Sequence, residues 1–331
     1  TIHFLFSQGV VRDITDLVAA QKFDLKQYYD GCIKALTLEG KLTGLPFKAH
    51  PGSAIIYYNE NIFKAAKLEV PKPTWTHEDE LTMAKTIQAM AKKDQPLFGI
   101  LLDTSWKGML TGIRSFGGQL LSPDGKKFLL NSDQGMAMLQ RLYDHFQTHK
   151  VSPTPEQIIG GAQQMWTSGY LGMFQAGTWA QVLRNTIGAK FKWMAVNNPI
   201  GPAGVGGSDF EVDCFSVTKA SKFPNEAFEW VKYLCNQESG VLLGVIGGTI
   251  GGRPDAYNSP VLLSDPVRPV FRDIMAKAQD SIIVANWRQS ECETALAQLT
   301  QPLWVGKEKV TKTFVDNVTK QIQDIMDKPK P

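Results

Sequence analysis

The sequence lacks the features that mark several large classes of protein. No run of about 18 apolar residues occurs, so it offers no candidate for a membrane-spanning helix. The net charge is only +3 and no long basic block occurs, which argues against nucleic acid as the main partner. The first residues also lack the basic start and the long apolar stretch of a signal peptide. We therefore expect either a cytoplasmic protein or one whose leader precedes this numbering.

Cysteine is scarce and dispersed. The four cysteines are Cys32, Cys214, Cys235 and Cys292, and no two of them form a Cys-x-x-Cys pair. Neither a zinc site nor an iron–sulfur cluster is therefore expected. An even number permits disulfides without implying them. Cys214 on a predicted strand and Cys235 on the following predicted helix are the first pair to test, against the ordinary alternative of buried free thiols.

Motifs for nucleotide, ester or metal chemistry are also missing. Residues 247–252 match the start of a phosphate-binding loop, but Arg253-Pro254 stands where Lys-Ser or Lys-Thr is required. No Gly-x-Ser-x-Gly or His-Glu-x-x-His motif occurs. His145 and His149 are spaced to share a helix face, but no third zinc ligand is identifiable, and we interpret them as part of a solvated face. The sequence therefore predicts no catalytic residue, no metal site and no cofactor.

What the chain does have is the length and apolar character of a two-domain protein. It contains 331 residues, of which 43% are hydrophobic and 20% charged, as expected for a globular protein with a substantial core. Predicted strands and helices alternate, which favours an α/β fold with mainly parallel sheets covered by helices. Three stretches rich in glycine and proline, near 50–53, 206–212 and 251–255, interrupt this pattern. They predict three crossings between two lobes.

The stretch Met173-Phe174-Gln175-Ala176-Gly177-Thr178-Trp179 carries the predicted binding site. Its first residues indicate a short buried strand, Gly177 permits a sharp turn, and Thr178 is a good N-cap for a helix that begins with Trp179. In open α/β sheets, ligands bind at the carboxyl ends of strands. An indole there can stack on the C–H face of a sugar while backbone N–H groups bind hydroxyls. The alternative is a tryptophan that packs against the sheet, as most tryptophans do.

Four stretches, taken in order, resemble the extracellular solute-binding proteins of bacterial sugar ABC transporters. They are Gly40-Lys41-Leu42-Thr43-Gly44-Leu45-Pro46-Phe47, Ile56-Tyr57-Tyr58-Asn59, the 173–179 stretch and Pro199-Ile200-Gly201-Pro202. The resemblance covers nearly the whole chain and implies a maltose-binding-protein-like fold, the type II periplasmic binding protein fold. Lobe one would comprise 1–50 plus 212–252, and lobe two would comprise 53–206 plus 256–331. The resemblance also implies that this chain begins after the first strand–helix unit of lobe one, which would leave an uncovered sheet edge.

Carried over residue by residue, the resemblance implies where the ligand binds. Family members stack sugar rings on aromatic residues of the second lobe, which by position are Trp106, Trp179 and Trp287 here. The other ligand-binding residues expected are Gly177 and Thr178 beside Trp179, and Gly207, Ser208, Asp213, Arg253 and His50 along the crossings. Arg253 has an equally weighted alternative as a salt-bridged hinge residue.

The expected function is the capture of a carbohydrate outside the cytoplasmic membrane and its delivery to an ABC permease by hinge closure around the ligand. The resemblance implies a monomer that is periplasmic or lipid-anchored outside the cell, and that meets the membrane only through the permease or a missing lipid anchor. One alternative is a glycosidase that uses carboxylates such as Asp213 and Glu291. Another is a binding protein for a phosphorylated polyol, a polyamine or, as the weakest option, a metal.

Overall fold

The computed structural model describes residues 2–93, 96–278 and 286–329, and the chain separates into two compact units. Unit 1 comprises Thr1–Pro51, Asp209–Ser290 and Lys328–Pro331, and unit 2 comprises Gly52–Ser208 and Glu291–Asp327. The chain therefore passes from one unit to the other after residues 51, 208 and 290, and its last few residues return to unit 1.

The glycine cluster at 247–252 does not form the third crossing that its composition predicts. Residues 256–290 belong to unit 1 and not to the second lobe. Gly251 packs on α11 (Gln237–Ile246), where its N–H donates to the Gly240 carbonyl at 3.3 Å. A Cβ built on Gly251 would lie 2.6 Å from the Gly240 Cα. These glycines allow a loop to pack closely on a helix, which composition alone does not distinguish from a crossing.

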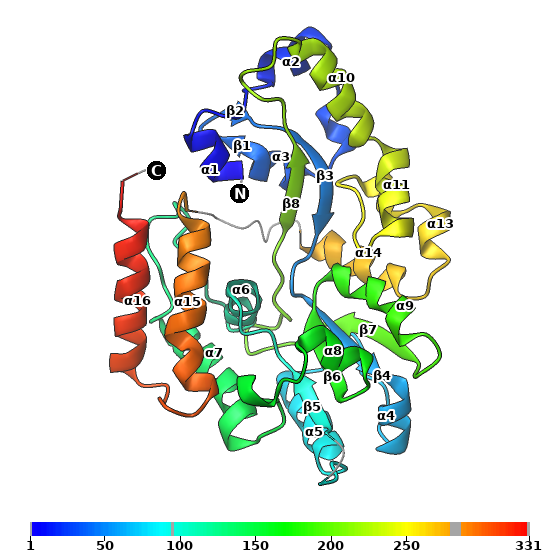
Figure 1. Cartoon of the computed structure of the whole chain (residues 1–331), viewed down its shortest axis with the longest axis vertical. Coiled ribbons are helices and arrows are strands. Elements are labelled where there is room, and N and C mark those ends of the chain that lie inside the picture. Colours follow the sequence, from blue (N-terminus) through cyan, green and yellow to red (C-terminus); the bar gives the residue numbers. More distant parts are fainter. Residues whose placement is uncertain (1, 94–95, 279–285, 330–331) are drawn as a thin grey trace. The chain divides into compact units, whose positions relative to one another are not determined.

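Unit 1 contains a two-stranded antiparallel sheet, in which β3 (Leu45–His50) pairs with β8 (Glu211–Phe215). A short hairpin of β1 (Thr37–Leu38) and β2 (Lys41–Leu42) precedes it. A core that includes Leu36, Leu45 and Phe228 joins the sheet to the helices. The helices of unit 1 besides α11 are α1 (Ile2–Ser7), α2 (Thr15–Ala20), the 3-10 helix η1 (Leu25–Gln27), α3 (Asp30–Leu36), α10 (Pro224–Leu234), α12 (Pro254–Tyr257), α13 (Pro260–Leu263) and α14 (Arg268–Lys277) (Figure 1).

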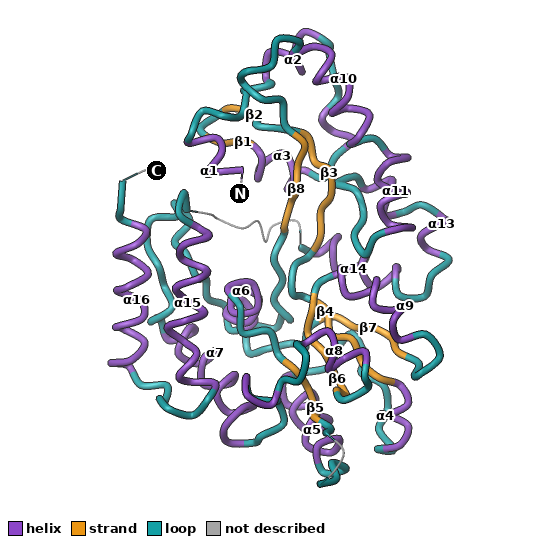
Figure 2. Tube along the Cα trace, in the orientation of Figure 1, coloured by secondary structure: helices purple, strands orange, loops and turns teal. Residues whose placement is uncertain are grey.

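Unit 2 is built on a four-stranded sheet in the order β5-β6-β4-β7 (Figure 2). Its strands are β4 (Ile55–Asn59), β5 (Phe98–Leu101), β6 (Leu171–Ala176) and β7 (Trp193–Asn197). β4 is antiparallel to both of its neighbours, whereas β5 is parallel to β6. The helical segments of unit 2 are α4 (Glu60–Ala65), α5 (His77–Gln88), α6 (Trp106–Ser115), α7 (Asp133–Tyr143), the π-helical turn η2 (Asp144–Thr148), η3 (Pro155–Gln157), α8 (Ala162–Thr167), η4 (Thr178–Leu183), α9 (Arg184–Ile187), α15 (Gln289–Trp304) and α16 (Lys312–Met326).

The α/β class is confirmed, but the prediction of mainly parallel sheets is wrong. Among the strands that the structure describes, β5 with β6 is the only parallel pair. An alternation of strands and helices makes two strands parallel only where a helical crossover joins them and they also pair with each other. β5 and β6 are joined in this way. By contrast, β4 follows the crossing after Pro51, and β7 precedes the crossing after Ser208.

One edge of the unit 2 sheet brings three distant segments together. Because β4 runs opposite to β5 and β6, its amino end lies beside the carboxyl ends of those two strands. Ser53 precedes β4, Asp103 follows β5, and Gln175 lies at the end of β6. The topology therefore places three polar residues, which are far apart in the sequence, at one edge of the sheet.

Cys214 and Cys235 are free thiols in this structure and form no disulfide with each other. Burial raises the pKa of the Cys235 thiol to about 12, which keeps it in the unreactive protonated form at neutral pH. A separate observation concerns the helices: none of those in the described part of the chain is both long and apolar enough to cross a bilayer.

Candidate ligand-binding pocket

A pocket of about 550 Å³ opens at this edge of the unit 2 sheet. The volume falls within the range of roughly 300–1,000 Å³ that is usual for ligand pockets. Its walls come from the strand ends, from residues 153–163 and from the end of α15, and all of them belong to unit 2. Four aromatic side chains line it: Phe146, Phe174, Trp179 and Trp304.

A ring of hydrogen bonds joins the three polar residues at the sheet edge. The Ser53 hydroxyl donates to Asp103 Oδ2 at 2.5 Å. The Asp103 N–H donates to Gln175 Oε1 at 3.0 Å, and Gln175 Nε2 donates to the Ser53 carbonyl at 3.1 Å. Ser53 and Gln175 are buried, while Asp103 is partly exposed to the pocket. The ring therefore fixes one carboxylate at the pocket wall.

The pocket wall carries a single charge. Of the residues that line it, all of which the structure describes, Asp103 is the only charged one. Its Oδ1 accepts from the Ser105 N–H at 2.9 Å, and its Oδ2 accepts from Ser53. A carboxylate can accept about four hydrogen bonds, so positions for further donors remain.

Trp179 stands on the first turn of η4, immediately after β6. Its side chain is 39% exposed and lines the pocket, and its edge meets Phe174 with ring centroids 6.2 Å apart and planes at 81°. A Cβ on Gly177 would lie 3.0 Å from the Trp179 ring and 3.1 Å from the Gly52 carbonyl, so glycine lets the indole lie close to the backbone. The predicted sequence of strand, turn and exposed indole is therefore present.

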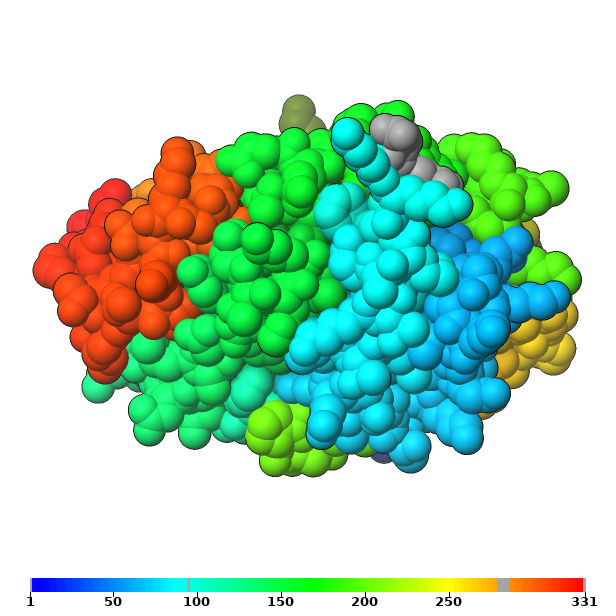
Figure 3. Space-filling model, turned by 90° about the horizontal axis from the view of Figure 1, so that it is seen from below, coloured from blue at the N-terminus to red at the C-terminus, as the bar shows by residue number. Residues whose placement is uncertain are grey.

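Another part of the pocket wall depends on the π-helical turn η2. In this turn Phe146 faces the pocket and packs against Trp304 at the end of α15, with ring centroids 5.6 Å apart. Gln147 Nε2 donates to the Trp304 carbonyl at 2.6 Å and fixes the same contact. The space-filling view shows the orange surface of α15 against the green surface of this part of unit 2 (Figure 3). π-helical turns are rare and are often found at functional sites.

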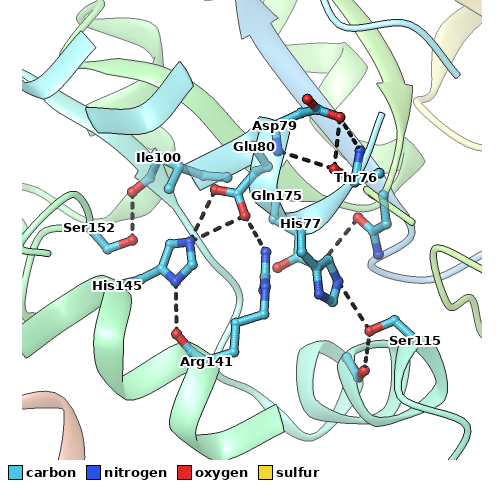
Figure 4. Close-up of polar contacts among 12 residues, drawn as sticks. Thr76, His77, Asp79, Glu80, Ile100, Ser115, Arg141, His145, Ser152 and Gln175 are labelled. Atoms are coloured by element: carbon cyan, nitrogen blue, oxygen red, sulfur yellow. Dashed lines mark hydrogen bonds and ion pairs between the residues drawn. The ribbon is translucent and has the colours of Figure 1, made fainter. Parts of the chain in front are cut away.

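A second polar group lies behind Gln175. A small cavity of about 20 Å³ shares Leu102 and Gln175 with the large pocket, and its other walls include His77, Glu80 and Arg141. Figure 4 shows that His145 and Arg141 approach Glu80 together. Gln175 therefore separates the open pocket from a buried ionised cluster.

Glu80 is the centre of that cluster. Its side chain is fully buried, both of its oxygens lie 3.2 Å from His145 Nε2, and the Arg141 guanidinium donates to Oε2. Burial raises the pKa of Glu80, but His145 and Arg141 lower it by more, and the resulting pKa is about 2. Glu80 is thus ionised at neutral pH and held by two protein partners.

His77 begins α5 beside this cluster. Its Nε2 lies 3.3 Å from the Ser115 hydroxyl, which itself donates to the Gly112 carbonyl at 2.7 Å (Figure 4). Burial lowers the pKa of His77 to about 3, and the Arg141 cation acts in the same direction. His77 is therefore neutral at physiological pH.

The spacing of His145 and His149 suggests that both lie on a solvated helix face, but for His145 this prediction is wrong. Its side chain is 2% exposed because η2 widens the helix and turns it toward Glu80. Within residues 2–93, 96–278 and 286–329, no group of three or more His, Cys, Asp or Glu side chains is placed to hold a metal ion.

The expected binding residues of unit 2 have different surroundings. Trp106 is only 4% exposed and stacks on Phe128 with centroids 5.3 Å apart, so the expectation of an accessible indole there is wrong. Thr178 is also buried, and its hydroxyl has no hydrogen-bond partner among the described residues. Gly207 has a φ of +70° and lies so close to α6 that a Cβ would be 1.9 Å from the Thr111 carbonyl. The Ser208 carbonyl accepts from Arg114 at 2.7 Å.

The remaining expected residues lie in unit 1. His50 and Asp213 are neighbours across β3 and β8, with His50 Nε2 3.8 Å from Asp213 Oδ2. Hydrogen bonding with His50, and then with Lys48, holds the pKa of Asp213 well below its usual range. Arg253 pairs with Asp255 at 2.6 Å, which is the salt-bridged state given above as its alternative.

Trp287 also belongs to unit 1 and not to the second lobe, because the third crossing comes after it. Its ring lies edge-on to His3 and roughly parallel to Phe6 from α1, with centroids 6.0 and 6.5 Å away. The three expected indoles therefore do not come from one unit. A ligand role for Trp287, and for the other expected residues of unit 1, stays a prediction.

Comparison with known proteins gives two kinds of similarity. The family model for bacterial extracellular solute-binding proteins matches residues 1–270. A search of curated protein sequences gave no match. Among solved structures, the ABC substrate-binding protein Lmo0181 from Listeria monocytogenes, in complex with cycloalternan, is similar with a TM-score of 0.87 at 18% identity, over 98% of this chain and 82% of that one.

Two further structures have similar scores but different ligands. Maltose-bound MalE3 of T. maritima has a TM-score of 0.79 at 19% identity, over 98% of this chain and 82% of that one. UgpB from Mycobacterium tuberculosis, in complex with glycerophosphocholine, has a TM-score of 0.81 at 18% identity, over 98% and 81% of the two chains. At such identities the similarity shows the fold, which is that of the type II periplasmic binding proteins.

Proposed function

We propose that this chain, which belongs to the family of bacterial extracellular solute-binding proteins, captures a carbohydrate outside the cytoplasmic membrane and delivers it to an ABC permease. The observation that carries this proposal is the pocket of unit 2, where an exposed indole, Trp179, lies near a fixed carboxylate, Asp103. An aromatic face suits the C–H face of a sugar ring, and a carboxylate suits its hydroxyls.

The charge of the pocket favours a carbohydrate over two of the three other ligand classes considered above, the phosphorylated polyol and the polyamine. A phosphorylated polyol needs a cationic partner, and the described lining of the pocket contains none. A polyamine needs an anionic partner for each ammonium group, and the lining offers one carboxylate, Asp103. Burying a charge without a partner is costly, so both alternatives fit this pocket less well than a neutral polyol does.

Binding would combine apolar contact with complete hydrogen bonding. Trp179 and Phe174 provide apolar area, while the Asp103 carboxylate accepts from ligand hydroxyls. Each hydroxyl that becomes buried without a partner would cost about 1–3 kcal/mol, so a ligand is favoured only when its hydroxyls match the wall. Closure of the two units over the ligand stays a prediction, as do a monomeric state and a periplasmic or lipid-anchored location.

Titration calorimetry with glucose, galactose, maltose and maltotriose tests the proposal. We expect saturable binding of at least one of them. Trp179→Ala should weaken that binding at least tenfold, about 1.4 kcal/mol, because it removes the exposed aromatic face. The matched control is Trp230→Ala, since Trp230 is an exposed indole of α10 that is stacked on Tyr233 and lies outside the pocket. Equal affinity in wild type and Trp179→Ala would contradict the site.

We further propose that the chain binds its ligand without transforming it. The carboxylates considered for a glycosidase do not form a pair in the pocket, because Asp213 belongs to unit 1 and Asp103 is the only charged residue of the lining that the structure describes. Glycoside hydrolysis requires two carboxyl groups about 5–10 Å apart. Incubation with the oligosaccharides that bind, followed by chromatography, should return them intact. The appearance of shorter products would contradict a purely binding role.

A further inference from the structure

We propose that Asp103 selects the ligand by charge, so that the pocket takes uncharged saccharides and rejects acidic ones such as uronic acids and sugar phosphates. The inference rests on the proposed function and adds a specificity residue and a ligand class to it. It comes from three observations on unit 2: the acceptor capacity of the carboxylate, the absence of a cation from the described lining, and the ring that fixes the carboxylate in place.

The first observation is that Asp103 has acceptor capacity left. The structure gives its carboxylate two hydrogen bonds, from the Ser53 hydroxyl at 2.5 Å and from the Ser105 N–H at 2.9 Å. These use about two of its four acceptor positions, and the residue lines the pocket. Asp103 can therefore accept from two ligand hydroxyls, for example a vicinal pair on one sugar ring. It cannot donate to a phosphate or carboxylate group.

The second observation is that no opposite charge offsets Asp103. The described lining of the pocket holds no lysine, arginine or histidine, and the Arg141 cation on the other side of Gln175 is already paired with Glu80. A ligand anion brought close to Asp103 would meet a like charge at partial burial, where Coulomb repulsion is stronger than in water. Neutral saccharides avoid this repulsion and keep the hydrogen bonds.

The third observation is that the carboxylate is positioned before the ligand arrives. Gln175 forms hydrogen bonds with the backbones of Asp103 and Ser53. It accepts from the Asp103 N–H at 3.0 Å and donates to the Ser53 carbonyl at 3.1 Å. Asn198 Nδ2 donates to the same Ser53 carbonyl at 3.0 Å. Recognition groups that are held by a second layer of hydrogen bonds lose little freedom on binding, which favours discrimination between similar ligands.

Matched pairs of neutral and acidic sugars test the inference. Dissociation constants would be measured by calorimetry for glucose with glucuronate, galactose with galacturonate, and maltose with maltose 1-phosphate. In the wild type, we expect each acidic member to bind at least tenfold more weakly than its neutral partner. In Asp103→Asn, the neutral sugar should lose at least fivefold in affinity, and the neutral-to-acidic ratio should fall at least tenfold, because the repulsion is gone.

Two more variants separate charge from structure. Ser53→Ala removes one hydrogen bond but keeps the charge, so the neutral-to-acidic ratio should stay close to that of the wild type even though both affinities fall. Asp124→Asn is the matched control, because Asp124 accepts from the Ser122 hydroxyl at the same distance of 2.5 Å on an exposed turn. It should bind all six sugars as the wild type does. Ser53→Ala also keeps the test decisive if Asp103→Asn does not fold.

The outcomes distinguish this inference from the proposed function. If Asp103→Asn weakens neutral and acidic sugars equally, or if the wild type shows no preference for neutral ones, charge selection by Asp103 is wrong while carbohydrate capture stands. A loss of the preference in Ser53→Ala would likewise contradict the inference. If no neutral sugar binds to the wild type, the proposed function itself is contradicted, and the charge selection with it.

Discussion

Asp103 and Glu80 are carboxylates of the same unit with opposite surroundings. Glu80 is fully buried between His145 and Arg141, and its pKa is lowered to about 2. Asp103 is partly exposed, accepts from a serine and a backbone N–H, and faces no cation in the described lining of the pocket. Glu80 is held by two side chains inside the protein and does not line the large pocket, whereas Asp103 accepts from two donors and lines the pocket. Burial and partner type, more than charge, separate a carboxylate that stabilises the fold from one that can bind a ligand.

The largest expected effect comes from breaking the buried side of this comparison. Glu80→Gln removes the anion and leaves Arg141 and His145 in a buried site without their charged partner. Removing one member of a buried ion pair costs about 3–5 kcal/mol, so the free energy of unfolding measured with urea should fall by that amount. Carbohydrate affinity in the folded state should change little, because Glu80 does not line the large pocket.

Asp316→Asn is the control for that experiment. Asp316 is a carboxylate whose side chain is 46% exposed, and it accepts from Asn131 at 2.7 Å and pairs with Lys312. Surface ion pairs contribute little to stability, so this variant should unfold at the same urea concentration as the wild type. A Glu80→Gln protein that is as stable as Asp316→Asn would show that the buried cluster does not stabilise unit 2.

Acid should destabilise the protein in two steps that belong to the same cluster. The folded pKa of Glu80, about 2, is below its ordinary value of 4.5, so the unfolded chain takes up this proton first as the pH falls. The stability that Glu80 contributes is therefore present above about pH 4.5 and is lost toward pH 2, and it amounts to about 3 kcal/mol. The folded pKa of His77, about 3, is below 6.5, so its contribution is lost between pH 6.5 and pH 3.

Two variants show which residue causes each step in the acid-induced loss of stability. Urea unfolding of the wild type across pH 7 to pH 3 should show a continuous decline in stability. His77→Gln should flatten the curve between about pH 6.5 and 4.5, and Glu80→Gln should make it less steep below about pH 4.5, where the decline due to His77 continues toward pH 3. A wild-type stability that is constant between pH 6.5 and 4.5 would contradict the assignment of a buried neutral His77.

A smaller effect is expected at the residue that separates the two regions. Gln175→Leu keeps the approximate size of the side chain but leaves the Asp103 N–H without its acceptor, which costs about 1–3 kcal/mol of stability. It should also weaken carbohydrate binding, because Asp103 is no longer held in place. Gln134→Leu, at an exposed position of α7, is the control and should change neither property. Loss of stability without any loss of affinity would show that Gln175 does not position the binding carboxylate.

Local signals in the sequence predict local structure well. Thr76 followed three residues later by Asp79 matches the capping-box pattern, and the structure contains this box at the start of α5. The Thr76 hydroxyl accepts from the Asp79 N–H, and the Asp79 carboxylate accepts from the Thr76 N–H. The strand, the glycine turn and the tryptophan on the first helical turn of 173–179 also form as predicted. The prediction of Thr178 as the N-cap is wrong, because Gly177 is the N-cap residue of η4 and the Thr178 hydroxyl makes no capping hydrogen bond. Each of these features is decided by residues within a few positions of one another.

Features that depend on distant segments are not predictable in the same way. Trp106 begins α6 and Trp179 stands on the first turn of η4, but Phe128, from the segment between α6 and α7, covers only Trp106. Asp103 follows the apolar run that forms β5, and this position is the signal that could have identified it. A single aspartate after a strand is not a motif, however, and its role emerges only when Ser53 and Gln175 arrive from other segments.

The π-helical turn η2 has a consequence for any attempt to re-engineer what this protein binds. Consecutive residues of that turn contact different neighbours, with His145 on Glu80 and Phe146 at the pocket wall. Deleting one residue from 144–148 would restore ordinary helical periodicity and rotate the preceding side chains by about 100° relative to those that follow. Directed-evolution libraries should therefore vary the identity of residue 146 at constant chain length, because an indel there would alter the ligand wall and the ionised interior together.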